Sequence, residues 1–152
     1  MAHELLRDRA AYEAARAASI EDPEGFWADQ AGGFTWQRRW DRVLEWDFEG
    51  PSVKWFIGGR LNITENCLDR HLEQHAQRIA MIWEPNDPHA PGQRITYREL
   101  HERVCAMANL LKRNGIGKGD RVAIYMPMIP ELLVSVLACA RIGAVHSVVF
   151  CG

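Results

Sequence analysis

The chain has 152 residues, 47% of them hydrophobic and 25% charged, and a formal net charge of −2. This composition is typical of a globular protein and excludes a disordered tail, and the length allows one domain, or one domain and part of another. The near-neutral charge excludes a broad basic surface, so we expect neither nucleic acid nor a membrane as a partner. The longest apolar run, Leu132 to Ala140, is too short to span a bilayer.

The amino-terminal residues also carry no targeting signal that we can identify. The stretch from Met1 to Ser19 has acidic residues among its arginines and lacks an apolar core, so it is neither a signal nor a transit peptide. The four cysteines are widely spaced, at positions 67, 105, 139 and 151. We therefore predict reduced thiols in a cytoplasmic protein rather than a disulfide framework.

The first part of the chain, to about residue 77, is irregular and rich in tryptophan. "ELLRDRAAYEAARAAS" is typical of a helix, and Asp22-Pro23 offers the cap and first position of the next one. "SVKWFIGG" predicts a strand ended by paired glycines. "TENCLDRHLEQHAQ" predicts a single helix opened by Thr64.

The second part is regular. "RIAMIWE" predicts a strand, and "TYRELHERVCAMANLLKRNG" predicts the clearest helix, with a capping box formed by Thr96 and Glu99. Gly115 suits the left-handed residue beyond that helix. "RVAIYMP", "PELLVSVLACARIG" and "AVHSVVF" then predict a strand, a helix beginning at Pro130 and a second strand. This order forms a βαβ unit with parallel strands, so the fold class is α/β.

The middle helix of this unit is apolar nearly all round, so we expect it to be covered on most sides. Parallel sheets are almost always buried on both faces, yet the last strand ends the chain. We therefore expect this sequence to be the opening piece of a larger protein. The alternative is that the tryptophan-rich part covers the sheet, which its few short elements make less favourable.

Three patterns invite a chemical interpretation. "GIGKGD", Gly115 to Asp120, resembles a phosphate loop but lacks the Ser or Thr after its lysine and precedes a strand, so it predicts a helix stop and a turn. Cys67, His71 and His75 would share one side of a helix, but only two of them could reach one zinc ion, which favours a half-buried cysteine with solvated histidines. His146 is more simply a hydrogen-bonded core residue than a catalytic one.

Several long motifs resemble one family. "WFIGGRLNITENCLDRHL", "ITYREL", "GDRVAIYMPMIPELL" and "LACARIGAVHSVVF" are similar, in order and spacing, to the amino-terminal part of the AMP-forming acetyl-coenzyme A synthetases. The resemblance implies the adenylate-forming fold. It also places residues 1–77 in the family's amino-terminal region and residues 78–152 at the beginning of the AMP-binding domain.

The resemblance further implies a two-step acetate–CoA ligase. Acetate attacks ATP to give acetyl-adenylate and pyrophosphate, and the thiol of coenzyme A then displaces AMP, with Mg²⁺ neutralising phosphate charge. The family's phosphate loop, ribose-binding carboxylate, acyl pocket, hinge aspartate and adenylating lysine match nothing in this chain, so no catalytic residue and no protein metal ligand is expected here.

One binding feature of the family has a partial match. Members carry Phe-Gly-Gly where this chain has Phe150, Cys151 and Gly152, and that turn contributes to the adenine end of the coenzyme A site. Phe150 and Gly152 match the pattern, whereas Cys151 departs from it and would place a side chain where close backbone approach is usual.

We therefore expect an amino-terminal fragment of an acetate–CoA ligase that is inactive by itself and lacks the rest of its own chain. A propionyl-CoA synthetase shares these motifs and is the nearest alternative. A non-catalytic interaction module that docks a partner through sheet edges and tryptophans is a second. A zinc-binding module on Cys67 and His71 is a third.

Overall fold

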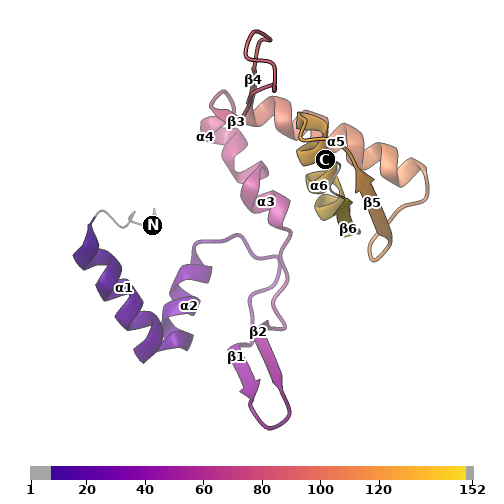
Figure 1. Ribbon diagram of the computed structural model, residues 1–152. Coiled ribbons are helices and arrows are strands. Elements are labelled where there is room, and N and C mark those ends of the chain that lie inside the picture. Colours follow the sequence, from indigo (N-terminus) through magenta and orange to yellow (C-terminus); the bar gives the residue numbers. More distant parts are fainter. Residues whose placement is uncertain (1–7, 150–152) are drawn as a thin grey trace. The chain divides into compact units, whose positions relative to one another are not determined.

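The computed structural model describes residues 8–149, which form two compact units divided between Leu61 and Asn62 (Figure 1). The first unit contains α1 (Arg9–Glu21), α2 (Pro23–Gly32), β1 (Arg42–Asp47) and β2 (Ser52–Ile57). The predicted start of the second helix is confirmed, because Asp22 accepts a hydrogen bond from the Gly25 amide and Pro23 is the first helical residue. The strand β2 was predicted, but its antiparallel partner β1 was not.

Aromatic side chains hold the first unit together. The rings of Trp36, Trp40 and Phe56 lie edge-on or tilted to one another, with centroids 4.9 to 5.5 Å apart. The indole nitrogen of Trp36 donates to the carbonyl oxygen of Ala31 at 2.8 Å, which joins this cluster to the end of α2. Trp36 and Trp40 therefore serve as packing anchors within their own unit, whereas Trp46 is 62% exposed.

The second unit begins with three short helical segments and continues into strands and two long helices. The segments are α3 (Ile63–Cys67), the 3-10 turn η1 (Asp69–His71) and α4 (Leu72–His75). The remaining elements are β3 (Ile79–Trp83), β4 (Gln93–Thr96), α5 (Tyr97–Arg113), β5 (Arg121–Tyr125), α6 (Pro130–Ile142) and β6 (Val145–Val149). The predicted domain boundary between residues 77 and 78 lies inside this unit and stays a prediction.

The single helix predicted from Thr64 onward is wrong. Asn62, not Thr64, caps α3, and the helical backbone is interrupted at Leu68, whose φ is −123°. The interruption turns Leu68 into the core, where it is 2% exposed, and leaves Thr64 buried as well. The changed backbone at Leu68 separates α3 from η1.

The later elements follow the prediction closely. The capping box of Thr96 and Glu99 is present at the start of α5, and Gly115 has the left-handed φ of +80°. Strands β5 and β6 pair in parallel, with Arg121 opposite Val145 and Tyr125 opposite Val149, and α6 connects them. The α/β class and the βαβ unit are therefore confirmed, whereas β3 and β4 form a separate antiparallel pair.

The core of the second unit lies between α5, α6 and strand β5, and also takes in Leu68 and, from β4, Ile95. Its buried side chains are Leu68, Ile95, Leu100, Val104, Ala108, Leu111, Ile124, Leu132, Val134, Ala138, Cys139 and Ala144. As expected, α6 is extensively covered, although Leu133 remains 38% exposed. The opposite face of the strand pair is open, with Tyr125 73% and Val145 57% exposed.

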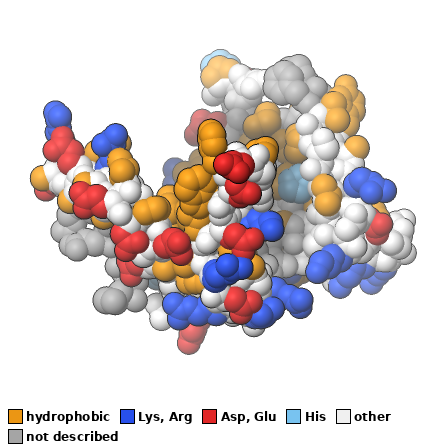
Figure 2. Space-filling model, turned by 90° about the horizontal axis from the view of Figure 1, so that it is seen from below, with side chains coloured by type: hydrophobic (Ala, Val, Ile, Leu, Met, Phe, Trp, Pro, Cys, Tyr) orange, Lys and Arg blue, Asp and Glu red, His pale blue; other side chains and the backbone are white. Residues whose placement is uncertain are grey.

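The surface carries charges of both signs. Acidic and basic side chains both lie on the face drawn in Figure 2, with hydrophobic side chains exposed between them. Among the helices of residues 8–149, none has the length and apolar character needed to cross a bilayer.

Candidate functional site

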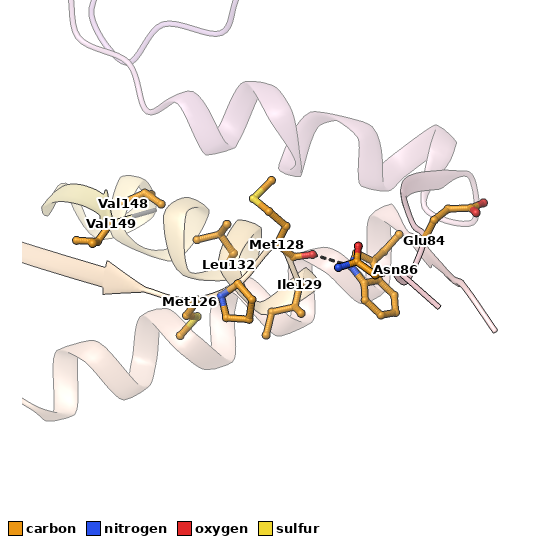
Figure 3. Close-up of a pocket in the computed structure, with 10 residues that line it drawn as sticks. Glu84, Asn86, Met126, Met128, Ile129, Leu132, Val148 and Val149 are labelled. Carbon is orange, nitrogen blue, oxygen red and sulfur yellow. Dashed lines mark hydrogen bonds between the residues drawn. The ribbon is translucent and has the colours of Figure 1, made fainter. Parts of the chain in front are cut away.

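A pocket of about 370 Å³ lies at the carboxyl ends of the two parallel strands (Figure 3). Its walls come from the end of β3, the loop between β5 and α6, and the end of β6. The residues that line it are Trp83, Glu84, Asn86, Met126, Pro127, Met128, Ile129, Leu132, Val148 and Val149. The carboxyl edge of a parallel sheet is the usual place for ligands in α/β folds, so this pocket is the candidate binding site.

The loop that forms the floor of the pocket is held at both ends. The indole nitrogen of Trp83 donates to the carbonyl oxygen of Met128 at 2.7 Å (Figure 3). The Ser135 hydroxyl lies 3.9 Å from the sulfur of Met126 and donates to the carbonyl oxygen of Glu131 at 2.7 Å. A hydrogen bond therefore joins the end of β3 to the loop after β5, and both of its residues line the pocket.

The lining determines what the pocket can do chemically. Most of it is apolar, Asn86 offers an amide, and Glu84 is the one titratable side chain among the lining residues. A single carboxylate without a nucleophile or a second acid beside it suits binding and orientation rather than proton transfer in a reaction. The described lining therefore makes the pocket a candidate binding surface.

The predicted coenzyme A residues, Phe150 and Gly152, lie outside the described residues, as does Cys151. They follow directly in sequence on Val149, which lines the pocket. Their assignment remains a prediction.

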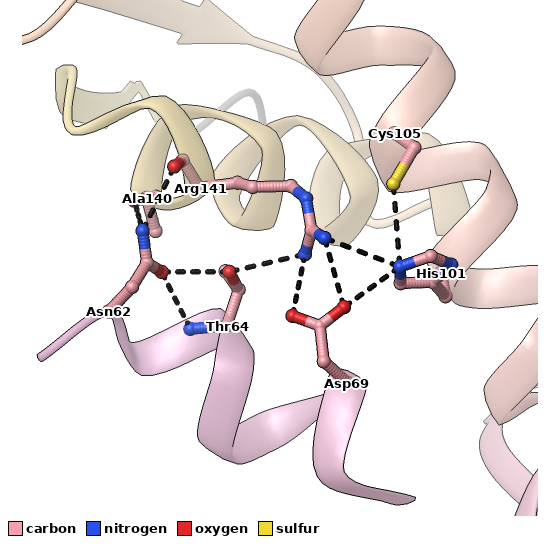
Figure 4. A network of polar contacts seen from close by, with 7 residues as sticks. All are labelled: Asn62, Thr64, Asp69, His101, Cys105, Ala140 and Arg141. Carbon is pink, nitrogen blue, oxygen red and sulfur yellow. Dashed lines mark hydrogen bonds and ion pairs between the residues drawn. The ribbon is translucent and has the colours of Figure 1, made fainter. Parts of the chain in front are cut away.

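A network of polar side chains forms a second cluster, away from this pocket (Figure 4). The Arg141 guanidinium donates to both carboxylate oxygens of Asp69, at 3.0 and 2.9 Å. His101 Nε2 lies 2.8 Å from the same carboxylate and 3.5 Å from the sulfur of Cys105. The cluster therefore joins η1 to α5 and α6.

Asn62 extends this connection. Its amide donates to the Arg141 carbonyl oxygen at the end of α6 and, more weakly, to that of Ala140, while its side-chain oxygen accepts from the Thr64 amide that begins α3. One side chain thus caps the end of one helix and the start of another.

The charged groups in the cluster shift one another's pKa values. Burial would raise the pKa of Asp69, but the hydrogen bonds and positive charge of Arg141, together with His101, outweigh it and hold that pKa below its ordinary value. The hydrogen bond to Asp69 raises the pKa of Arg141 despite its partial burial. Both groups are therefore charged at neutral pH.

The cluster does not form a catalytic triad, although it contains a cysteine, a histidine and an aspartate. A triad needs the nucleophile and the carboxylate on different nitrogens of the imidazole. Here Cys105 and Asp69 both face Nε2 of His101. The arrangement indicates a structural tie between helices.

The other candidate residues fall in different places from those expected. Cys67 is exposed rather than half-buried, and His71 and His75 are partly buried, with their rings stacked at a centroid distance of 6.3 Å. The three residues occupy three separate segments because the helix is interrupted. Within residues 8–149, no group of three or more His, Cys, Asp or Glu is placed to hold a metal ion.

His146 was expected in the core and is exposed instead, so that expectation is wrong. It lies on β6, whose residues are all exposed and which pairs, within residues 8–149, with β5. The "GIGKGD" stretch forms a turn in which the Gly117 amide donates to Asp120 at 2.8 Å, as predicted.

Two family models match the chain. The one described as "Acetyl-coenzyme A synthetase N-terminus" matches residues 12–67, and the one described as "AMP-binding enzyme" matches residues 68–152. The chain belongs to the AMP-binding enzyme family. The two matches meet between Cys67 and Leu68, where the helix is interrupted.

Curated members of the AMP-binding family are similar over nearly the whole chain. The acetyl-coenzyme A synthetase of Bdellovibrio bacteriovorus is 53% identical over 95% of this chain, and that of Alkalilimnicola ehrlichii is 54% identical over 93%. Among solved structures, acetoacetyl-CoA synthetase from Streptomyces lividans superposes with a TM-score of 0.81 at 28% identity over 97% of the chain. The expected adenylate-forming fold is confirmed by this likeness.

The match covers only part of these AMP-binding enzymes. The chain spans 23% and 22% of the two curated relatives and 22% of the solved structure.

The sequence reasoning missed the pocket and the polar network. Asp69 and Arg141 are 72 positions apart, and Trp83 and Met128 are 45 apart. No local periodicity links such residues. Arg141 lies near the end of α6, a mostly apolar helix, and a charged residue in such a place was an available signal of a buried partner.

Proposed function

We propose that this chain supplies the amino-terminal part of an AMP-forming acetate–CoA ligase of the cytoplasm. The whole enzyme would make acetyl-CoA from acetate, ATP and coenzyme A through an acetyl-adenylate, with release of AMP and pyrophosphate. The observation that carries the proposal is the 53% identity over 95% of the chain to a protein named acetyl-coenzyme A synthetase.

The chain's own contribution to this reaction is binding. The apolar pocket at the carboxyl ends of β5 and β6 lies where α/β enzymes hold their ligands, and its lining offers no acid–base pair. We assign Phe150 and Gly152 to the adenine end of coenzyme A, since they follow the last pocket-lining strand residue. Cys151 places a thiol between them.

Mg²⁺ would neutralise charge on the ATP phosphates in the whole enzyme. The described part of the chain has no cluster of carboxylates, histidines or cysteines suited to a metal ion. We therefore give the ion no ligand from residues 8–149.

The isolated chain should be inactive. When it is mixed with ATP, acetate, Mg²⁺ and coenzyme A, we expect no pyrophosphate above the background of a heat-denatured sample. Steady release would show that these 152 residues contain the catalytic groups and would overturn the proposal.

A chimera tests the positive side. The matched 146-residue segment of the B. bacteriovorus enzyme is replaced by this chain, and pyrophosphate release is measured with acetate, propionate and acetoacetate. We expect activity, with acetate preferred. A soluble, cooperatively melting chimera without activity would contradict the proposal, and a preference for propionate would favour the propionyl-CoA alternative.

A further inference from the structure

A second hollow, of about 330 Å³, lies between α5 and α6 on the side of Cys105 and has no part in the binding role proposed above. From α5 it is lined by Cys105, Asn109 and Lys112, which are spaced i, i+4 and i+7 and so follow one face of the helix. From α6 it is lined by Arg141 and Ile142. A partly exposed thiol therefore opens into a cavity together with two cationic side chains.

The three described cysteines differ sharply in their surroundings. Cys139 is completely buried, and burial raises the pKa of its thiol, which makes it unreactive. Cys67 is exposed on α3. Cys105 is the one of the three that is half-buried, lies 3.5 Å from an imidazole nitrogen and shares a cavity with Lys112 and Arg141.

The charges favour a negatively charged reagent at this thiol. The charge of Arg141 is largely balanced by Asp69, with which it forms two hydrogen bonds, so Lys112 supplies the excess positive charge of the cavity. Lys112 lies two helical turns from Cys105, about 10 Å along the axis. The net charge of the chain is −2, so any attraction of anions to this cavity would come from the charges around it and not from the chain as a whole.

We propose that Cys105 is a site of reversible mixed-disulfide formation with negatively charged, low-molecular-weight disulfides. The Cys105 thiolate attacks one sulfur of the disulfide, the reagent's S–S bond breaks, and a new S–S bond forms to Cys105. The other half leaves as a thiolate and takes up a proton, which balances the one that the Cys105 thiol gave to solvent. The disulfide is the only oxidant that the step needs.

The test compares three probes on the full chain: negatively charged glutathione disulfide, uncharged 2-hydroxyethyl disulfide and positively charged cystamine. Peptide mass spectrometry follows the adduct at each cysteine with time, at low and at high ionic strength. We expect Cys105 to react faster with the negative probe than with the neutral one, relative to the same ratio at Cys67. High salt should reduce the difference.

Two matched variants locate the cause. Lys112→Gln and Arg113→Gln each remove one positive charge from the last turn of α5, but only Lys112 lines the cavity. We expect Lys112→Gln to lower the negative-to-neutral rate ratio at Cys105 by about two- to fourfold, from the Coulomb energy of a charge at this distance in water. Arg113→Gln should lower the ratio by less, because the Arg113 side chain does not line the cavity. The same ratio at Cys67 and Cys105, or no effect of Lys112→Gln, would overturn the proposal.

Discussion

Asp69 connects three helical segments through contacts that no pattern in the sequence predicts. Its carboxylate receives two hydrogen bonds from Arg141 and one contact from His101, and all three side chains are mostly shielded from water. Hydrogen bonds to charged groups make a net contribution of about 1.5 to 3 kcal/mol each, and less where water reaches the pair. The interaction is therefore a sensitive point for mutation.

Replacing Asp69 by Asn removes the negative charge while keeping the shape. We expect the free energy of unfolding to fall by about 1 to 3 kcal/mol, because Arg141 is left partly buried without its counter-charge. Denaturant unfolding followed by circular dichroism measures this change. The control is Asp41→Asn, which breaks the exposed pair with Arg38 and should cost less than about 1 kcal/mol. Equal losses in both variants would contradict the prediction.

The same carboxylate gives a pH dependence. Because the pKa of Asp69 is lower in the folded than in the unfolded protein, its stabilising effect is present above the unfolded value, near 3.8, and disappears as the pH falls through the folded value. The difference in stability between the native chain and Asp69→Asn should thus be full at pH 6 and shrink below pH 4. A difference that stays constant down to pH 2 would show that the charge is not its source.

At the scale of elements, the turn after α6 depends on one glycine. Gly143 ends the helix with a φ of +77°, and a Cβ there would lie 3.1 Å from the Cγ atom of Lys118. Gly115 ends α5 with nearly the same φ, +80°, but has no atom within 4 Å of that position. A side chain at Gly115 would therefore meet backbone strain alone, whereas a side chain at Gly143 would meet both strain and crowding.

Alanine at either glycine should destabilise the chain by about 1 to 2 kcal/mol through the left-handed backbone alone. We expect Gly143→Ala to cost more than Gly115→Ala, since the Lys118 side chain must also move. Thermal unfolding of the two variants side by side checks this order. The reverse order would mean that Lys118 shifts without cost and that the helix ends differ in some other way.

Local chemistry predicted most of these elements. The capping box of Thr96, the prolines at the start of α2 and α6, and the glycine beyond α5 are signals within one or two turns of the chain. The single helix predicted from Thr64 is instead broken at Leu68, which is buried in the core, and local propensity did not predict that break.

At the scale of the whole molecule, the uncovered face of the β5–β6 pair exposes apolar side chains. Tyr125, Val145 and Val149 lie on it and are 73%, 57% and 45% exposed. Parallel sheets are normally covered on both faces. We expect this face to be covered in the chimera with the longer relative.

A lysine at position 145 tests that expectation. In the isolated chain, Val145→Lys should change the free energy of unfolding by less than about 0.5 kcal/mol, because the side chain is exposed. In the chimera the same change should abolish activity or solubility, since the lysine would be buried without a partner. Val145→Ile, which keeps the surface apolar, is the control and should preserve both. An active Val145→Lys chimera would show that the face stays open.

The sequence by itself determined the α/β class, the parallel unit and most helix ends, because these depend on periodicity, caps and turns that act over a few residues. It also carried the family likeness, which rests on the resemblance of several long motifs. Tertiary structure alone decided the break at Leu68, the pairing of β3 with β4, the pocket fixed by Trp83 and Met128, and the meeting of Asp69 with Arg141 and His101. These features join residues far apart in the chain, and packing of the core is what brings them within hydrogen-bonding distance.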